Sequence, residues 1–472
     1  MEEEFLNKLK EAADKLRNLE KKPIRIICHL DSDGLSSASI LTKTLSRENL
    51  DFSLSIFKGL TREAVRMLSM EDYSYYIFAD LGTGQLNDIN ELLHDRTIFI
   101  LDHHELQGDS KENIYHLNPC LYGIDGGKDI CGAGITYLFC KALNEKNKDL
   151  AHLAVIGAIG EVQEKKGFTG LNQEILKDAI LSGKLEVRTG LRMFGFQTRP
   201  IHRVLQYSTD PYIPGVTGDE SGAIDFLQSL SIELKDDYGE WRKLVNLNED
   251  EMKKLITAII LKRMGSEKTP DDVLGNVYVL RDEKEESPMK DAREFATLLN
   301  ACGRLGKVSL GIGACIGDEN LKSKSIELLD EYKREIINNL NWFYKNRKTE
   351  KIIEENGFVI INAENNVRDT MIGTLTSMLS RSNLYEDGTI MLSMAYTLDG
   401  EIKVSLRLSG YKDYDFDLRE FIKDVVDRTG HGNSVGGHKQ AAGAIIPQEK
   451  EETFLQYAKE VLQNRMSKLV AS

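Results

Sequence analysis

The chain has 472 residues, which predicts two or three domains, each large enough to bury its own core. Hydrophobic residues make up 41% of the sequence and charged residues 29%, and no apolar run reaches about eighteen residues. A disordered chain and a membrane-spanning one are therefore excluded. The net charge of -14 has the wrong sign for bulk attraction of nucleic acid. Any contact with phosphate must come from local basic groups, backbone amides or metal ions.

The N-terminal segment and the cysteines indicate the compartment. Residues 1–22 are charged throughout and lack an apolar stretch, so we expect no signal peptide, a cytoplasmic protein and no membrane partner. The cysteines form no CxxC pair and have no zinc-site spacing, so we interpret them as reduced and mostly packed thiols. They are Cys28, Cys120, Cys131, Cys140, Cys302 and Cys315.

The N-terminal part of the chain alternates helix and strand patterns. Apolar positions at helical spacing predict an amphipathic helix over residues 4–20. A short β-branched run at 24–28 predicts a buried strand, and 35–45 predicts the helix that follows it. Two further strands are expected at 75–79 and 97–101. This alternation predicts an α/β fold with a parallel sheet, whose functional groups gather at the carboxyl ends of the strands.

The pattern of charged and apolar residues changes further along the chain. After a first domain at 1–210, charged amphipathic segments with few strand signals predict a helical insertion at 211–284. We expect 285–320 to return to the first domain and 321–346 to form a long connecting helix. Strand patterns and a glycine-rich loop predict a second, smaller α/β domain at 347–472.

Four clusters of acidic and imidazole side chains follow predicted strands or lie beside them. An isolated Asp after a strand is usually a helix cap or turn former, and a lone His pair is usually surface sequence. Three of the clusters, however, end strands that should lie side by side. Together they offer enough donors for two divalent cations about 3.5 to 4 Å apart that share one bridging carboxylate. The clusters are His29, Asp31 and Asp33; Asp80; Asp102, His103 and His104; and Glu161.

In their order along the chain, these clusters and the late Gly-Gly-His-Lys-Gln-Ala-Ala-Gly segment at 436–443 resemble the motifs of the DHH phosphoesterases with a DHHA1 domain. The His-x-Asp-x-Asp-Gly form of the first motif at 29–34, the helical insertion and Asn-Val-Arg-Asp-Thr at 366–370 are similar to archaeal RecJ-like nucleases of the GINS-associated type. The resemblance implies a DHH-type parallel-sheet domain with a helical insertion, joined by a long helix to a smaller α/β DHHA1 domain.

The resemblance also implies how the donors divide between two ions, with Asp80 bridging them and His104 facing the scissile phosphate. Mixed carboxylate and imidazole ligation favours Mn²⁺, with Mg²⁺ as the second choice. A water between the metals would lose a proton and attack phosphorus. One ion would be held by His29, Asp31 and Asp80, and the other by Asp33, Asp80, His103 and Glu161.

Substrate-binding residues outside the metal site are implied in the same way. Arg304 ends an Asn-Ala-x-Gly-Arg segment that contacts phosphate in RecJ-type enzymes, and Ser405 and Arg407 stand where the DHHA1 domain presents a phosphate-binding Ser and Arg. The simpler interpretations are exposed arginines and an ordinary turn. The glycine-rich loop could bring backbone amides close to a phosphate. Its residues are Gly436, Gly437 and His438.

The expected function is metal-dependent exonucleolytic hydrolysis of phosphodiester bonds in single-stranded DNA or RNA, in DNA replication or repair. A cleft between the two α/β domains would admit one strand. Two departures from the family pattern, Glu161 in place of Asp and Val435 in place of a glycine, suggest a slow enzyme. The first alternative is a replication-fork scaffold that binds GINS and the replicative helicase, although a pure scaffold has no need of the donors. The second is a small-molecule phosphoesterase acting on short oligonucleotides, cyclic dinucleotides or a polyphosphate.

Overall fold

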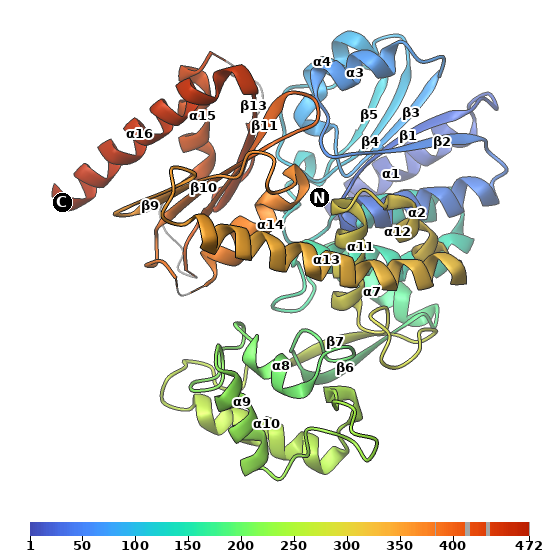
Figure 1. Cartoon of the computed structure of the whole chain (residues 1–472). Helices are drawn as coiled ribbons and strands as arrows, with labels where there is room; N and C mark the ends of the chain where they lie inside the picture. Colours follow the sequence, from blue (N-terminus) through green and yellow to red (C-terminus); the bar gives the residue numbers. More distant parts are fainter. Residues whose placement is uncertain (383, 411–415, 431–434, 472) are drawn as a thin grey trace. The chain divides into compact units, whose positions relative to one another are not determined.

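The computed structural model describes residues 1–382, 384–410, 416–430 and 435–471, with the backbone alone for residues 438 and 464–471 (Figure 1). It divides into unit 1, Met1–Leu328, and unit 2, Leu329–Ser472. In the described ranges, no helix combines the length and the apolar character needed to span a bilayer.

Unit 1 contains a parallel sheet with the strand order β2-β1-β3-β4-β5. Its strands β3 and β4 are almost entirely buried apolar runs, as expected for a sheet covered on both faces. The predicted parallel sheet is confirmed, with β2 and β5 as strands that the sequence patterns had not indicated. The bounds are β1 Ile24–His29, β2 Phe52–Phe57, β3 Tyr75–Ala79, β4 Thr97–Leu101 and β5 Ile114–Leu117.

Helices pack on both faces of this sheet. On one face, apolar residues of α3 and α4 enclose alternate strand residues such as Tyr76, Phe78 and Ile100. α1, α2 and α5 contact strands of the sheet, and α6 and α7 pack behind them. Burial on both faces leaves the carboxyl ends of the strands as the open edge for function. The bounds are α1 Glu2–Arg17, α2 Ser32–Arg47, α3 Arg62–Ser69, α4 Leu86–Leu92, α5 Gly132–Leu143, α6 Ala151–Gly160 and α7 Gly170–Leu181.

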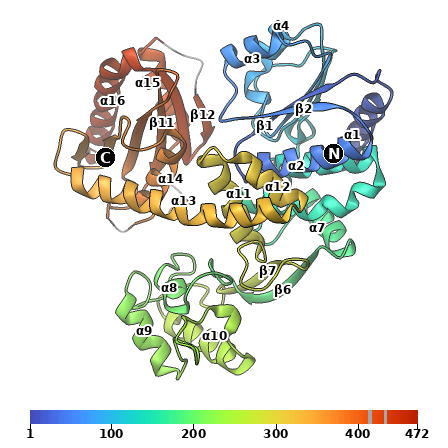
Figure 2. The ribbon, with the colours of Figure 1, turned by 45° about the vertical axis from the view of Figure 1, so that its right-hand side comes forward.

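An antiparallel ribbon of β6, Leu185–Leu191, and β7, Leu274–Leu280, leads into and out of the helical insertion (Figure 2). The sequence patterns had not indicated this ribbon, because its half-exposed strands show little alternation. The insertion has its own apolar core, which includes Leu205, Leu227 and Ile259. Its helices are α8 Ile201–Gln206, α9 Glu220–Ser229 and α10 Glu249–Arg263.

Three helices follow the ribbon. α11 packs against α2 and α6, and α12 packs against α2, so this segment adds to the helical layer of unit 1. The 28-residue α13 begins in unit 1 and ends in unit 2. The bounds are α11 Ala292–Arg304, α12 Val308–Ile316 and α13 Glu319–Asn346.

Unit 2 contains a mixed sheet with the order β12-β13-β11-β10-β9-β8. One face packs on α15 and α16, where Val404 and Leu406 join Phe421 and Phe454 in a single core. α14 contacts β10 and β11. The expected fold class, an α/β domain with a helical insertion and a separate smaller α/β domain, is confirmed. The bounds are β8 Ile352–Glu355, β9 Phe358–Asn362, α14 Asp369–Ser380, β10 Ile390–Tyr396, β11 Glu401–Leu408, α15 Leu418–Arg428, β12 Val435–His438, β13 Ala441–Pro447 and α16 Glu451–Ala471.

Candidate metal centre

The first acidic motif forms the turn between β1 and α2. Asp31 is the N-cap of α2, and its Oδ1 accepts hydrogen bonds from the backbone N–H groups of Asp33 at 3.1 Å and Gly34 at 3.0 Å. Its Oδ2 lies 2.8 Å from Nδ1 of His29, the last residue of β1. A Cβ on Gly34 would lie 2.2 Å from the carbonyl oxygen of His29, so the turn requires glycine there. The motif spacing is therefore the spacing of a tight strand-to-helix turn.

Asp33 points the other way, toward the N-terminus of α5. Its two oxygens accept hydrogen bonds from the backbone N–H groups of Gly132 at 2.7 Å and Ala133 at 2.8 Å, and the side chain is fully buried. A Cβ on Gly132 would lie 2.8 Å from Cβ of Asp80, and one on Gly157 would lie 2.5 Å from Oδ1 of Asp33. Small residues from two helices thus let the carboxylates approach each other closely.

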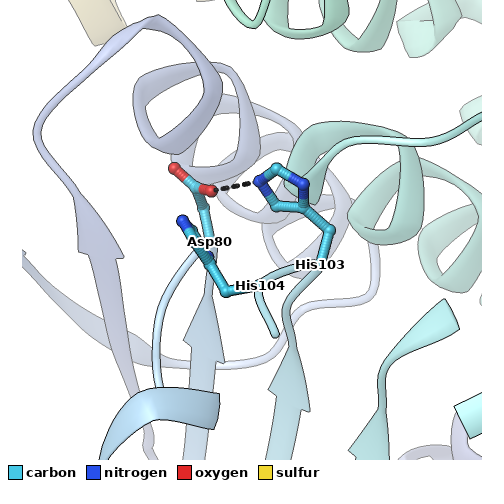
Figure 3. Close-up of side chains that lie close together, drawn as sticks. All are labelled: Asp80, His103 and His104. Carbon is cyan, nitrogen blue, oxygen red and sulfur yellow. Dashed lines mark ion pairs between the residues drawn. The ribbon is translucent and has the colours of Figure 1, made fainter. Parts of the chain in front are cut away.

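Asp80 lies at the centre of the cluster. It follows β3 with a φ of +60°, a conformation that Asp tolerates better than most residues, and is 2% exposed. Its Oδ2 is 3.4 Å from Nδ1 of His29, and its Oδ1 is 3.4 Å from Nε2 of His103 (Figure 3). Among the described residues, neither Oδ2 of Asp80 nor Nε2 of His103 has a hydrogen-bond partner.

A backbone contact defines the tautomer of His103. Nδ1 of His103 lies 2.6 Å from the carbonyl oxygen of Gly126, which can only accept, so Nδ1 carries the proton. In the neutral ring, Nε2 then presents its lone pair toward Asp80. A lone pair and a carboxylate that face each other can bind the same cation, and a ring whose other nitrogen donates to a carbonyl oxygen is the usual arrangement of a metal-binding histidine.

His104 is oriented by the first residue of its own motif. Its Nδ1 donates to Oδ1 of Asp102 at 2.6 Å, and Oδ2 of Asp102 accepts from the backbone N–H of Thr83 at 2.8 Å. Asp102 is fully buried, whereas the His104 side chain is 45% exposed. Asp102 therefore holds an imidazole in place, and its own oxygens are occupied by N–H donors.

The electrostatics also favour a cation beside these side chains. Burial and the carboxylate of Asp80 raise the pKa of Asp33 to about 7. Burial and the carboxylate of Asp31 raise the pKa of Glu161 to about 7. Burial alone would lower the pKa of His103, but Asp80 and Asp33 raise it well above its ordinary value. Carboxylates crowded in this way are stabilised by a bound cation.

Two groups of possible ligands share one residue. The ligand atoms of His29, Asp31 and Asp80 lie within 4.8 Å of one another, and so do those of Asp80, His103 and His104. A ligand atom of His104 thus lies within 4.8 Å of those of Asp80 and His103, whereas the resemblance implied that His104 faces the scissile phosphate, and both roles stay predictions.

The two remaining predicted ligands lie around these groups. Oδ2 of Asp33 is 3.7 Å from Nε2 of His103. Glu161 is the C-cap of α6, and its charge acts on His103. The ligand roles of both residues stay predictions.

Supporting residues that the sequence patterns did not mark lie behind the imidazoles. Nδ2 of Asn118 donates to Oγ1 of Thr83 at 3.1 Å and to the carbonyl oxygen of His104 at 2.8 Å. Oγ1 of Thr83 also lies 3.0 Å from Nε2 of His116. Thr83, His116 and Asn118 are buried polar residues in or near the ends of strands and turns, where no periodic pattern distinguishes them.

α11 packs against the turn after β1. Oδ1 of Asn300 accepts from the backbone N–H of Ser32 at 3.0 Å, and a Cβ on Gly303 would lie 1.8 Å from the carbonyl oxygen of Leu30. Arg304 is the last residue of α11 and is half-buried. The Asn-Ala-x-Gly-Arg segment therefore supports the metal-site turn with its Asn and Gly, and the same contact brings Arg304 beside that turn.

The other predicted substrate residues lie in unit 2. Nε of Arg407 donates to Oγ of Ser377 at 3.0 Å, and Nη1 of Arg407 lies 3.4 Å from Oγ of Ser405. Gly436 lies in β12, and Gly437 has a φ of +120° with no room for a Cβ, which would lie 2.3 Å from the carbonyl oxygen of Ala441. The side chain of His438 lies outside the described residues.

The fold is thus a parallel sheet with carboxylates and imidazoles at its carboxyl edge, followed in the chain by a separate α/β unit. The N-terminal domain of the DHH family matches residues 23–158, the DHH-CID domain matches 193–274 and the DHHA1 domain matches 356–464. The chain belongs to the DHH family and has the RecJ-like architecture.

Two relatives in sequence align with nearly the whole chain. An uncharacterised protein of Methanocaldococcus jannaschii is 31% identical over 97% of this chain and 99% of its own length. A Bacillus subtilis protein bears the name of an SPbeta prophage-derived single-strand DNA-specific exonuclease. It is 25% identical over 94% of this chain and 67% of its own length.

Solved structures show the same fold. RecJ from Thermus thermophilus in complex with Mn²⁺ aligns with a TM-score of 0.58 and 16% identity over 97% of this chain, which spans 55% of that protein. An exonuclease RecJ bound to manganese aligns with a TM-score of 0.56 and 17% identity over 96% of this chain and 94% of its own. CDC45 from Entamoeba histolytica aligns with a TM-score of 0.62 and 12% identity over 98% of both chains.

Proposed function

We propose that the chain is a metal-dependent exonuclease that hydrolyses phosphodiester bonds of single-stranded nucleic acid. The proposal depends mainly on the position of the Asp80 carboxylate, which belongs to both groups of possible ligand atoms. A carboxylate shared in this way is what a bridging ligand in a two-metal phosphodiesterase site requires, and it supports this role for Asp80. Nε2 of His103 and Oδ2 of Asp80 are buried and have no hydrogen-bond partner among the described residues. Atoms of this kind are suited to bind a cation.

Each side chain has a part in this proposal. His29 and Asp31 would hold one ion together with Asp80, and Asp33, His103 and Glu161 would complete the second site. Bound there, two divalent ions would lower the pKa of a water and neutralise the charge that grows on the attacking and leaving oxygens. Asp102 orients the ring of His104 through a 2.6 Å hydrogen bond, and this imidazole is half-exposed. In this orientation it would bind either an ion or the scissile phosphate.

The ligand types and the relatives support the choice of metal and substrate. Imidazole together with carboxylate suits Mn²⁺ better than Mg²⁺, which prefers oxygen ligands alone. The name of the Bacillus subtilis relative supports a single-stranded DNA substrate. Arg304 in unit 1 and Ser405 and Arg407 in unit 2 are the proposed contacts to backbone phosphates. We place the activity in DNA replication or repair.

A scaffold role at the replication fork, with GINS and the replicative helicase as partners, is the second candidate. The likeness of the fold to CDC45 favours it. The buried ligand atoms that lack partners within the described ranges speak against a purely structural role, because unpaired polar groups cost stability that a scaffold would have no reason to retain. Pull-down of purified GINS at micromolar concentration tests the scaffold role, and absence of association rejects it.

The nuclease proposal is tested with single-stranded DNA and RNA, each labelled at the 5′ or the 3′ end, in Mn²⁺, Mg²⁺ or EDTA. We expect shortening from one end, faster in Mn²⁺, and none in EDTA. A blunt duplex of the same sequence is the matched control and should remain intact. Cleavage that survives EDTA, or equal cleavage of the duplex, would reject the proposal.

A further inference from the structure

The two faces of β11 have different chemistry. Ile402, Val404 and Leu406 are fully buried in the core beneath α15 and α16. The alternate residues Lys403 and Ser405, with Arg407 beyond them, lie on the opposite face, because side chains of a strand alternate between faces. Since these three residues point away from the core, they form a polar row along one strand.

α14 covers this row with small residues. Nε of Arg407 donates to Oγ of Ser377 at 3.0 Å, and a Cβ on Gly373 would lie 3.4 Å from Oγ of Ser405. Ser393 of β10 pairs with Ser405 and is completely buried, and among the described residues its Oγ has no hydrogen-bond partner. The row therefore consists of basic and hydroxyl groups, and beside it lies a buried hydroxyl of β10 that has no partner among the described residues.

The ammonium group of Lys403 lies over a part of the sheet that lacks side chains. Its Nζ is 3.9 Å from the position that a Cβ of Gly443 would occupy. Gly443 pairs with Ser405 on one side and Gly436 on the other, and a Cβ on Gly436 would meet no atom within 4 Å. A Cβ on Gly443 would also lie 2.9 Å from the carbonyl oxygen of Val404, so the open space is the one over Gly436, next to Gly443 and its partner Ser405.

The charge of Lys403 is incompletely compensated. Within the described residues it has no hydrogen bond or ion pair, and Asp369 is the one carboxylate that acts on it. Burial lowers the pKa of Lys403, and the guanidinium of Arg407 lowers it further. A bound anion would stabilise such a half-buried ammonium group.

We propose that Lys403 binds a backbone phosphate of the nucleic-acid strand, next to the phosphate that Ser405 and Arg407 bind. Residues two apart in a strand are about 7 Å apart, which is similar to the spacing of successive phosphates in an extended strand. The space over Gly436 then receives the phosphate oxygens. This inference rests on the proposed function, because it names a further contact to the same substrate.

The test is the salt dependence of binding of a fluorescent oligothymidylate, measured by anisotropy in EDTA so that no cleavage occurs. Loss of one phosphate contact should reduce the slope of log affinity against log salt concentration by about 0.7 for a single strand. We expect this reduction and about tenfold weaker binding for Lys403→Gln, and near wild-type behaviour for Lys403→Arg. Lys423→Gln, at an exposed position of α15, is the matched control and should leave the slope unchanged.

A second variant avoids the charge change. Gly436→Val adds a side chain where no atom lies within 4 Å, so the sheet should fold, and the valine should occupy the space of the phosphate and weaken binding. A wild-type slope for folded Lys403→Gln overturns the inference, as does wild-type affinity for Gly436→Val. If one of these two results is found and the wild-type protein still binds and cleaves single strands, the inference fails and the proposed function stands. If the wild-type protein neither binds nor cleaves single strands, the inference and the proposed function both fail.

Discussion

The backbone carbonyl oxygen of Gly126 accepts a hydrogen bond from Nδ1 of His103 at 2.6 Å. The same oxygen accepts a second bond from Nε2 of Gln163 at 3.0 Å, and Oε1 of Gln163 accepts from Nδ2 of Asn172 at 2.6 Å. The orientation of a candidate metal ligand therefore depends on a buried amide network that reaches α7. Such outer contacts tune the affinity of the ligands they orient.

Replacing Gln163 with Leu should weaken metal binding by about tenfold to a hundredfold, the usual effect of losing an outer-shell group. The leucine fills the volume but no longer holds the carbonyl of Gly126 in place. Calorimetric Mn²⁺ titration measures the affinity, and activity should recover at saturating metal. Gln173→Leu, on the exposed side of α7, is the control and should bind metal normally. Unchanged affinity in Gln163→Leu would show that the network is not coupled to the site.

Asp80→Asn should cost more activity than replacement of any other predicted ligand, by more than about a hundredfold, because both ions depend on this carboxylate. Asn is chosen because it keeps the shape and tolerates the φ of +60° at this position. Mn²⁺ stoichiometry and nuclease rate are measured on the same preparation. Asp72→Asn, at an exposed position before β3, controls for loss of one negative charge. Two bound ions and a wild-type rate in Asp80→Asn would refute the bridging role.

Glu161→Asp should preserve metal dependence and change turnover by less than about a hundredfold, because the charge stays and the carboxylate moves by one methylene. Glu161→Ala should lose affinity for one ion and nearly all activity. Metal titration alongside nuclease rates distinguishes the two variants. If Glu161→Ala is as active as the parent protein at saturating Mn²⁺, the second ion is held by other groups.

Val162→Gly should stabilise the protein by about 1 kcal/mol. Val162 follows the C-cap of α6 with a φ of +60°, which a β-branched residue adopts only with strain, and its side chain is 60% exposed, so little packing is lost. The midpoint of thermal unfolding measures the effect. Val162→Ala keeps a Cβ in the same conformation and should gain less. An equal or lower midpoint for the glycine variant would mean that the valine contributes contacts that outweigh its strain.

Arg304→Ala should weaken binding of single strands by about tenfold to a hundredfold, the effect of one hydrogen bond to a charged group, without changing Mn²⁺ affinity. The arginine is proposed to contact phosphate and not the ions. Anisotropy in EDTA measures strand binding, and calorimetry measures the metal. Arg66→Ala removes a guanidinium from the exposed face of α3 and serves as the control. Parallel loss of metal binding in Arg304→Ala would assign it a structural role at the turn after β1.

The sequence by itself determined the fold class and predicted which donor side chains lie together. Short apolar strands ending in Asp or His predicted a parallel sheet, and the carboxyl ends of neighbouring parallel strands meet at one edge. For that reason the sequence predicts that His29, Asp80 and His103 lie close to one another, and the folded chain brings them together. Their roles as metal ligands stay predictions.

The tertiary structure alone decided how the cluster is supported. Asp33 is held by backbone amides of Gly132 and Ala133, about a hundred residues away, and Gly126 orients His103 through its carbonyl oxygen. Backbone amide and carbonyl groups are nearly the same in all residues. The pattern of side chains therefore does not predict which of these groups will contact a ligand residue. Asp102 shows the same limit: the sequence places it at a strand end like Asp80, but only the folded chain directs its carboxylate to the imidazole of His104.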